Sequence, residues 1–152
     1  MKFNLGHDLY EACVAGDLDR VEEVLTASDR SCLTWRHPNG WTALHAAIEV
    51  RNAVLVGRLI EAGAEISAPD GGGDPPLHHA LHVELEGRGS AVDDAYGGRL
   101  VLTRLLLDAG ADPLLRGSDK TPAIGLARFY GSAEAEHLLA GYLKERLPYS
   151  GE

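Results

Sequence analysis

Apolar side chains recur along the chain at the spacing of amphipathic helices, and they come in paired segments. The stretch "TALHAAIEV" (42–50) carries a helical stripe of mostly small side chains, and a bulkier stripe follows it. The first stripe consists of Leu44, Ala47 and Ile48, and the second of Val56, Leu59 and Ile60. A matching bulky stripe returns at Leu102, Leu105 and Leu106. The pattern predicts two helices joined by a short turn, used more than once.

The paired segments repeat with a nearly constant period. Four pairs in which a Leu or Ile stands three residues before an Ala mark this repetition: Leu9…Ala12, Leu44…Ala47, Leu77…Ala80 and Ile124…Ala127. Successive alanines are 35, 33 and 47 residues apart. Periods of this length are typical of stacked repeats. The last interval exceeds 33 by 14, which indicates one repeat with an insertion.

The second helices locate the insertion. "LIEAGAEISA" (59–68) aligns with "LLLDAGADPLL" (105–115). The Gly of the AGA triplet follows its Ala by 16 residues in one unit and by 30 in the other, again a surplus of 14. The extra residues therefore lie between the two helices of the third unit, at about 83–98.

Glycine and proline mark the ends of these helices. Gly63 and Gly110 follow the bulky stripes, where a left-handed helix cap favours a residue without a Cβ. Pro38, Asn39 and Gly40 predict a tight turn before the next helix. One such unit cannot bury its own apolar face, so we expect neighbouring units to stack, with the alanines allowing close approach.

These features resemble the ankyrin repeat family. "NGWTALHAAIEVRNAVLVGRLIEAGAEISA" (39–68) is similar to a full repeat, and it matches the T-P-L-H-x-A motif at Thr42, Leu44, His45 and Ala47. "DPPLHHALH" (74–82) matches at Pro76, Leu77, His78 and Ala80, with Pro75 in the Thr position. In the last unit, opened by Thr121-Pro122, Gly125 takes the His position. Arg51-Asn52 also departs from the usual Gly-His of the turn.

The resemblance implies an all-α ankyrin repeat solenoid of about four helix-turn-helix units in a single domain. "DLYEACVAGDLDRVEEVL" (8–25) resembles the N-terminal capping repeat of the family. The expected units cover about 5–38, 39–68, 69–115 with the insertion 83–98, and 116–146.

Composition and charge exclude several classes of protein. The chain has 152 residues and a net charge of −9. This charge argues against a nucleic-acid binder, which would normally carry a basic stripe, and allows a basic protein partner. Solubility alone also explains such a charge. The chain has no run of 18 apolar residues, so no membrane span is expected, and the N-terminus lacks a signal-peptide pattern. With Cys13 and Cys32 outside any paired motif, we expect a cytoplasmic protein.

Three histidines in "DPPLHHALHVE" (74–84) raise the question of a metal site. His78 and His82 would share one face of a helix, but no Glu directly follows the first His as a zinc protease requires. A structural zinc usually takes four ligands, often cysteines, and Cys13 and Cys32 lie far away in the stack. The resemblance implies a structural role for His45 and His78, bonded to nearby backbone. We expect His79 and His82 to point away from the helix stack, either as contact residues or as incidental surface histidines.

The resemblance implies a partner-binding surface on the concave face and on the loops between units, called fingers in this family. The candidate residues there are Trp35, Arg36, Trp41, Glu49, Asp70, Asp74, His79, His82, Arg116, Asp119 and Lys120, with Tyr96 added from the insertion. Trp35 and Arg36 are the preferred contacts, because Trp and Arg are frequent in binding hot spots. Trp41 has an alternative role, packing over the next repeat. The alternative for the insertion is a tolerated loop without function.

The sequence thus predicts a non-catalytic protein–protein interaction module with no cofactor, no metal and no catalytic residue. It is expected to be a monomer when free. Within this class, an immunity or antitoxin-like inhibitor of a basic bacterial toxin is the specific hypothesis. The alternatives are a metal-binding protein or enzyme that uses His78, His79 and His82, and a homo-oligomeric scaffold.

Overall fold

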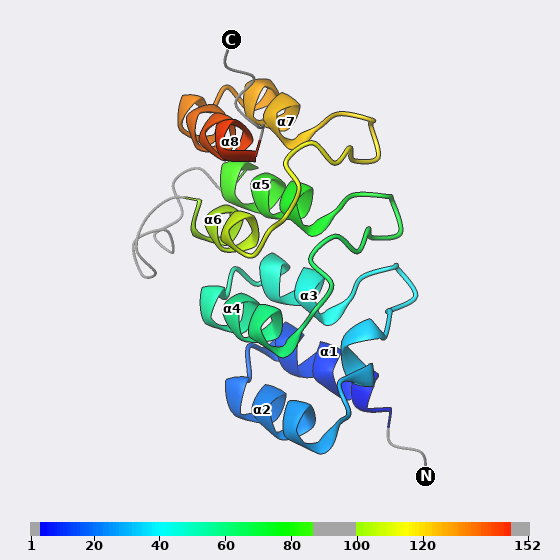
Figure 1. Ribbon diagram of the computed structural model, residues 1–152. Coiled ribbons are helices and arrows are strands. Elements are labelled where there is room, and N and C mark those ends of the chain that lie inside the picture. Colours follow the sequence, from blue (N-terminus) through cyan, green and yellow to red (C-terminus); the bar gives the residue numbers. More distant parts are fainter. Residues whose placement is uncertain (1–3, 87–99, 147–152) are drawn as a thin grey trace.

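The computed structural model describes residues 4–86 and 100–146, which form a stack of four helix pairs (Figure 1). The first helices of the pairs are α1 (Leu5–Ala15), α3 (Ala43–Glu49), α5 (Pro76–Glu86) and α7 (Ala123–Phe129). The second helices are α2 (Leu18–Ala27), α4 (Ala53–Ala62), α6 (Val101–Asp108) and α8 (Ala133–Arg146). A short 3-10 helix, η1 (Ser31–Thr34), follows the first pair. The all-α solenoid predicted from the sequence is confirmed.

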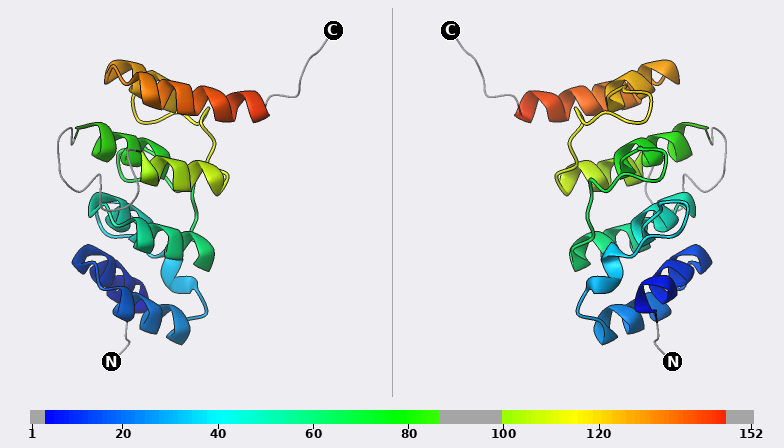
Figure 2. Two further views of the ribbon diagram at one scale, coloured as in Figure 1. Left: turned by 90° about the vertical axis from the view of Figure 1, so that its left-hand side faces the viewer. Right: turned by 90° about the vertical axis from the view of Figure 1, so that its right-hand side faces the viewer.

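The two sets of helices form two layers along the stack. Each first helix contacts the first helix of the next pair, in the order α1, α3, α5, α7, and long loops project from this layer (Figure 1). Figure 2 shows the pairs one above the other from both sides. In residues 4–86 and 100–146 the structure has no named strand, and Arg116 and Pro122 form an isolated antiparallel bridge in the last loop. None of the helices described is both long and apolar enough to cross a membrane.

Local chemistry determines where the helices begin and end. The side chains of Asn4, Asp17 and Asn52 each accept a hydrogen bond from the backbone N–H three residues later, at 3.0–3.1 Å. Gly63 and Gly110 adopt left-handed φ values of 99° and 101°, where a side chain would be strained. Both glycines therefore end a second helix, as the sequence predicted.

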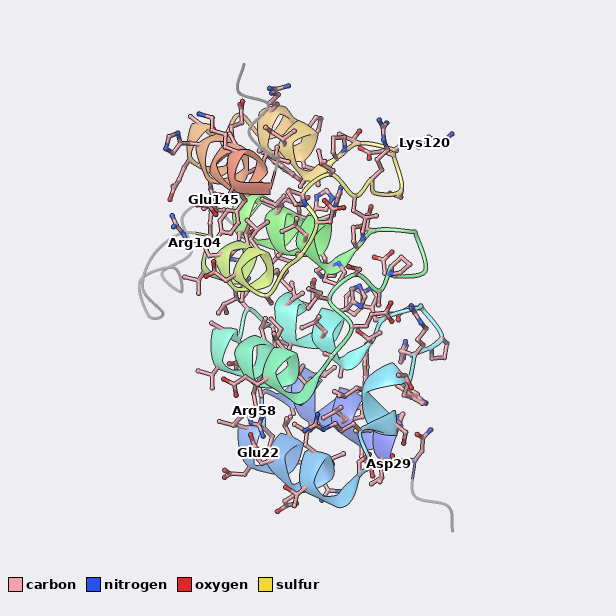
Figure 3. The ribbon with its side chains drawn as sticks, viewed as in Figure 1. Glu22, Asp29, Arg58, Arg104, Lys120 and Glu145 are labelled. Carbon is pink, nitrogen blue, oxygen red and sulfur yellow. The ribbon has the colours of Figure 1, made fainter. Side chains whose placement is uncertain are left out.

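The small residues of the repeat lie between stacked helices. Ala47, Ala80 and Ala127 are fully buried, and Ala12 is nearly so. The large residues three positions earlier, Leu9, Leu44 and Leu77, belong to the same core cluster. The burial of these residues confirms the predicted helix register. On the outer layer, Arg58 of α4 forms a two-contact ion pair with Glu22 of α2 (Figure 3).

The third unit differs from the sequence expectation at the start of its insertion. Residues 83–86 continue helix α5 through Glu86, although the insertion was predicted to begin at Val83. The helix continues because Val83 and Leu85 pack on the core, Leu85 buried and Val83 partly so. Residues 87–99, with Tyr96 among them, lie outside the described residues.

Glu84 of α5 caps the helix that follows the insertion. Leu100, at the N-cap position of α6, has a left-handed φ of 63° and no side-chain cap of its own. Glu84 Oε1 accepts from the N–H of Leu102 at 2.6 Å, and Oε2 accepts from the N–H and the hydroxyl of Thr103 at 3.1 and 2.6 Å. The carboxylate satisfies N–H groups that a helix start leaves without partners and complements the helix dipole.

We expect Glu84→Ala to lower the free energy of unfolding by about 2 kcal/mol, because the cap is charged and Thr103 is buried. Urea unfolding followed by circular dichroism measures the loss. Glu84→Gln keeps one acceptor oxygen and should lose about half as much. Glu61→Ala, at an exposed position of α4, is the matched control and should change stability by less than about 0.5 kcal/mol. Equal effects for Glu84→Ala and Glu61→Ala would show that α6 does not depend on this cap.

Candidate functional site: the inner surface of the stack

Three loops project from the inner layer and are joined side by side. These fingers comprise residues 36–42, 69–75 and 116–122. The first two touch backbone to backbone, with the Gly71 N–H donating to the Asn39 carbonyl at 3.2 Å, and a Cβ on Gly71 would overlap that carbonyl. The second and third are linked by the Ser118 N–H, which donates to the Asp74 carboxylate at 2.7 Å. The fingers therefore form one braced surface.

The predicted contact arginines serve as internal braces of the fingers. Arg36 donates to the carbonyl of Gly40 at 3.0 Å and to that of Pro69 in the next finger. In the third finger, Arg116 donates to the Lys120 carbonyl at 3.0 Å, four residues later, as Arg36 does to Gly40. Asp119 also stabilises this finger by accepting from the Thr121 N–H at 2.8 Å, and Lys120 lies at its tip (Figure 3). Asp70 accepts from the Gly72 N–H in the second finger.

Both tryptophans are half-buried. Trp35 packs on α1, where a Cβ on Gly6 would overlap its side chain, and its ring lies 5.7 Å from the ring of Tyr10. Trp41 makes an edge contact with His79 of the next unit, with ring centroids 5.0 Å apart. Trp41 thus packs over the next repeat, the alternative given above. Part of the Trp35 side chain is therefore occupied by packing on α1. This packing was not predicted, because a glycine in a helix gives no sign of the side chain that lies against it.

His45 and His78 are buried and bonded to backbone, as the resemblance implied. Nδ1 of His45 accepts from the Thr42 N–H at 3.1 Å and lies 3.0 Å from the Thr42 hydroxyl. His78 bonds through Nε2 to the Thr121 carbonyl of the next unit at 2.7 Å. Its Nδ1 is buried without a hydrogen-bond partner in the described residues, because Pro75 stands where Thr42 stands and has neither N–H nor hydroxyl.

Replacing Pro75 with threonine should therefore stabilise the protein by about 1 kcal/mol. The new N–H and hydroxyl would satisfy His78 Nδ1, and this gain exceeds the advantage that proline has in the unfolded chain. The matched control is Pro75→Val, which has the shape of threonine and the N–H but no hydroxyl, and should gain less. Thermal unfolding ranks the three proteins. A threonine variant less stable than the valine variant would contradict this account of His78.

The other two histidines of the 74–84 segment, His79 and His82, bond to side chains of other units. His79 Nε2 lies 2.7 Å from a carboxylate oxygen of Glu49 on α3, and the His79 side chain is 11% exposed. His82 Nδ1 lies 2.7 Å from the hydroxyl of Tyr130, which donates to Glu86 at 2.8 Å. Burial, with this bond to Glu86, raises the pKa of Tyr130 to about 12. His79 and His82 thus face the inner surface but are held by partners.

The geometry does not support a metal site on these histidines. His78 bonds to a backbone carbonyl, His79 to Glu49 and His82 to Tyr130, so the three rings have different partners. Across residues 4–86 and 100–146, no group of three or more His, Cys, Asp or Glu side chains could hold a metal ion.

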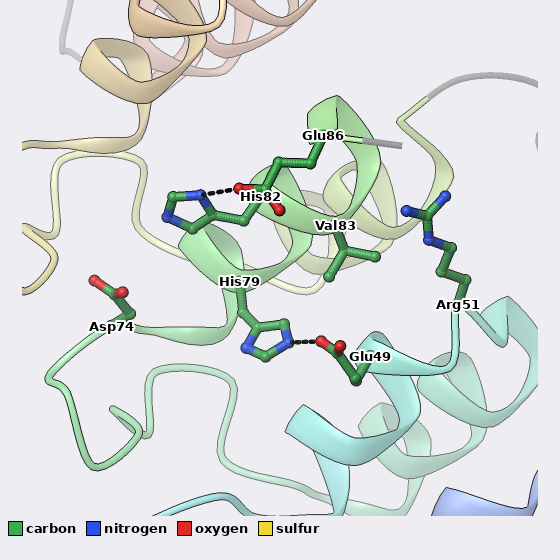
Figure 4. Close-up of a pocket in the computed structure, with 7 residues that line it drawn as sticks. All are labelled: Glu49, Arg51, Asp74, His79, His82, Val83 and Glu86. Atoms are coloured by element: carbon green, nitrogen blue, oxygen red, sulfur yellow. Dashed lines mark hydrogen bonds and ion pairs between the residues drawn. The ribbon is translucent and has the colours of Figure 1, made fainter. Parts of the chain in front are cut away.

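Two adjoining cavities open on the inner layer. The first, about 330 Å³, lies between α3 and α5 (Figure 4). It is lined by Glu49, Arg51, Asp74, His79, His82, Val83 and Glu86. The second, about 360 Å³, lies against α7 and is lined by His82, Asp119, Thr121, Gly125, Leu126 and Phe129. His82 belongs to both, so the two cavities meet at its ring.

The cavities bring together some of the predicted site residues and add others. Glu49, Asp74, His79 and His82 line the first cavity, and Asp119 lines the second. Trp35, Arg36, Trp41, Asp70, Arg116 and Lys120 belong to the fingers and their bases and line neither cavity. Glu86 and Phe129 were not among the residues predicted from the sequence. Glu86 lies four residues after His82 on one helix face, a spacing that could have indicated the pair.

Comparisons with known proteins agree with this architecture. The Ankyrin repeat family profile matches residues 39–71. An ankyrin repeat domain of Acinetobacter baumannii, known from its crystal structure, is similar in fold with a TM-score of 0.74 and 28% identity over 88% of this chain and 63% of that one. E3 ubiquitin-protein ligase KEG of Arabidopsis thaliana is 32% identical over 137 residues, covering 70% of this chain. RelA-associated inhibitor of Mus musculus is 43% identical over 75 residues, covering 47% of it. The chain matches about 8% of the length of each of these two relatives.

Proposed function

Because the chain is an ankyrin repeat solenoid, a fold whose members are protein–protein interaction modules, we propose that it binds a protein partner through its inner layer and fingers without catalysing a reaction. The braced fingers carry this proposal. Three loops from different units, joined by the Gly71–Asn39 and Ser118–Asp74 hydrogen bonds, form a continuous surface beside the two cavities. A surface held in place before binding loses little conformational entropy when a partner docks.

The charge of the chain favours a basic partner. The net charge of −9 attracts positively charged proteins over long range and accelerates their association. We propose that the module is an inhibitor that covers such a partner, as an immunity protein covers a toxin. The mouse relative is itself named an inhibitor. The buried free thiols of Cys13 and Cys32 are compatible with the reducing cytoplasm, where we expect the protein to act.

Co-expression with the proteins encoded beside it tests the proposal. A neighbour that co-purifies with the chain in a defined ratio, and whose toxicity to the host disappears on co-expression, would support the inhibitor role. A partner that binds without loss of its activity would support binding but not inhibition. The absence of any co-purifying neighbour, combined with no binding by isothermal titration calorimetry to the purified neighbours, would refute both.

A further inference from the structure

The inner layer carries one strongly exposed aromatic side chain. Phe129, at the end of α7, is 80% exposed, more than any other large apolar residue in the described part of the chain. Its ring makes an edge-type contact with the ring of Tyr130, with centroids 5.3 Å apart, and Phe129 lines the second cavity together with Leu126. An exposed aromatic residue beside an open cavity is typical of a surface that binds a partner.

The first cavity has the opposite chemistry. Glu49, Asp74 and Glu86 bring three carboxylates to its wall, and Arg51 brings one guanidinium (Figure 4). Within the described residues Glu49 contacts the His79 imidazole, Asp74 accepts from a backbone N–H, and Glu86 accepts from the Tyr130 hydroxyl and lies 4.0 Å from the His82 ring. No lysine or arginine of the described residues pairs with these carboxylates, so the cavity wall carries three carboxylates against one guanidinium.

We propose that the joined cavities bind an extended segment of the partner, with a Lys or Arg side chain in the first cavity and an apolar side chain against Phe129 and Leu126 in the second. This inference rests on the proposed function and specifies its partner. The charge of the first cavity selects the cation, and the exposed ring selects the apolar residue.

The spacing of the helices determines the spacing in the ligand. Packed helix axes lie about 8–10 Å apart, and an extended chain rises about 3.3 Å per residue with alternate side chains on the same side. This spacing corresponds to about three residues of an extended segment. Because only alternate side chains share one side, the nearest same-side positions lie two and four residues apart, at about 6.6 and 13 Å, and we expect the cation and the apolar residue at one of these two separations. This pattern, basic-x-apolar or basic-x-x-x-apolar, is the feature to seek in a partner.

A synthetic peptide titrated into the isotope-labelled full chain tests the proposal by NMR. The probe is an acetylated, amidated Gly-Ser peptide with one Arg and, two residues later, one Leu; a second probe places the Leu four residues later. At least one probe should shift amide signals of α5 and α7, and binding should weaken as salt rises. Two control peptides, with Glu for Arg or Ala for Leu, should bind at least about fivefold more weakly.

Variants of exposed residues then locate the two subsites. Phe129→Ala should weaken binding of the Arg-Leu peptide about tenfold, and Glu86→Gln about threefold, with the melting temperature nearly unchanged. Leu114→Ala, at an exposed apolar position outside both cavities, is the matched control and should bind like the parent protein. Equal binding of the Glu-containing peptide, shifts confined to residues outside both cavities, or no shift at millimolar peptide would overturn the proposal.

The two proposals can fail separately. If a co-purifying partner still binds Phe129→Ala and Glu86→Gln at parental affinity, the protein is a binding module but the cavities are not its peptide site. If no partner exists, the proposed function itself is wrong.

Discussion

Replacing Ala47 with glutamate is expected to unfold the protein. Ala47 is fully buried in α3, a helix in contact with both α1 and α5. The new carboxylate would lie between stacked helices with no basic partner, and the side chain has no space there. A buried unpaired charge and overpacking together cost more than about 4 kcal/mol, a large part of the stability of a small domain. Far-ultraviolet circular dichroism at 25 °C should show the loss of helix.

Val54→Glu is the matched control for this prediction. Val54 is 50% exposed in the first turn of α4, where a carboxylate is favourable near the helix N-terminus. Its melting temperature should stay within a few degrees of that of the parent protein. A folded Ala47→Glu variant with an unchanged melting temperature would mean that the register of the stacked helices is wrong.

Acidification from pH 7 to pH 4 should remove about 3 kcal/mol of stability through His45 alone. Burial, together with a smaller contribution from the neighbouring His79, lowers the pKa of His45 to about 4 against an opposing effect of Asp70. The unfolded chain, with a histidine pKa near 6.5, binds a proton more readily than the folded chain between these values. The contribution of neutral His45 to the free energy of unfolding is therefore fully present above about pH 6.5. It falls as the pH drops toward 4, and about 2 kcal/mol is lost by pH 5.

Urea unfolding at pH 7 and pH 5 measures this dependence. His45→Gln, which can accept a hydrogen bond from Thr42 but does not titrate, should lose about 2 kcal/mol less than the parent protein between the two pH values. If the variant does not fold, NMR titration of the His45 ring in the parent protein gives the pKa directly. A value near 6.5 would refute the prediction.

The sequence was sufficient to predict the features that repeat. The alanines at 47 and 80 lie at helix contacts, and the glycines at 63 and 110 end helices, because each position must satisfy the same packing in every unit. Period and residue size therefore determined the helix order and the register. The structural role of His45 and His78 was implied by the resemblance to the ankyrin repeat family.

Features that occur once in the chain could not be read from the period. The contact between His82 and Tyr130 joins residues 48 positions apart, and nothing in either local sequence indicates the partner. The bonds of Arg36 and Arg116 to loop carbonyls were not predicted either: both side chains are exposed, as expected of contact residues, and also brace their own fingers, since a guanidinium can bond to a backbone as well as to a partner. The two cavities depend on such contacts, so their position required the three-dimensional structure.

The carboxylate of Glu84 on the start of α6 has a consequence for protein engineering. The hydrogen bonds from Leu102 and Thr103 to Glu84 hold the start of α6 against α5. The position of α6 therefore does not depend on the length of the chain between the two helices. Lengthening a loop costs little free energy when its ends are already held. A change in the number of residues between Glu86 and Leu100 is therefore expected to leave the start of α6, and its packing on α5, in place.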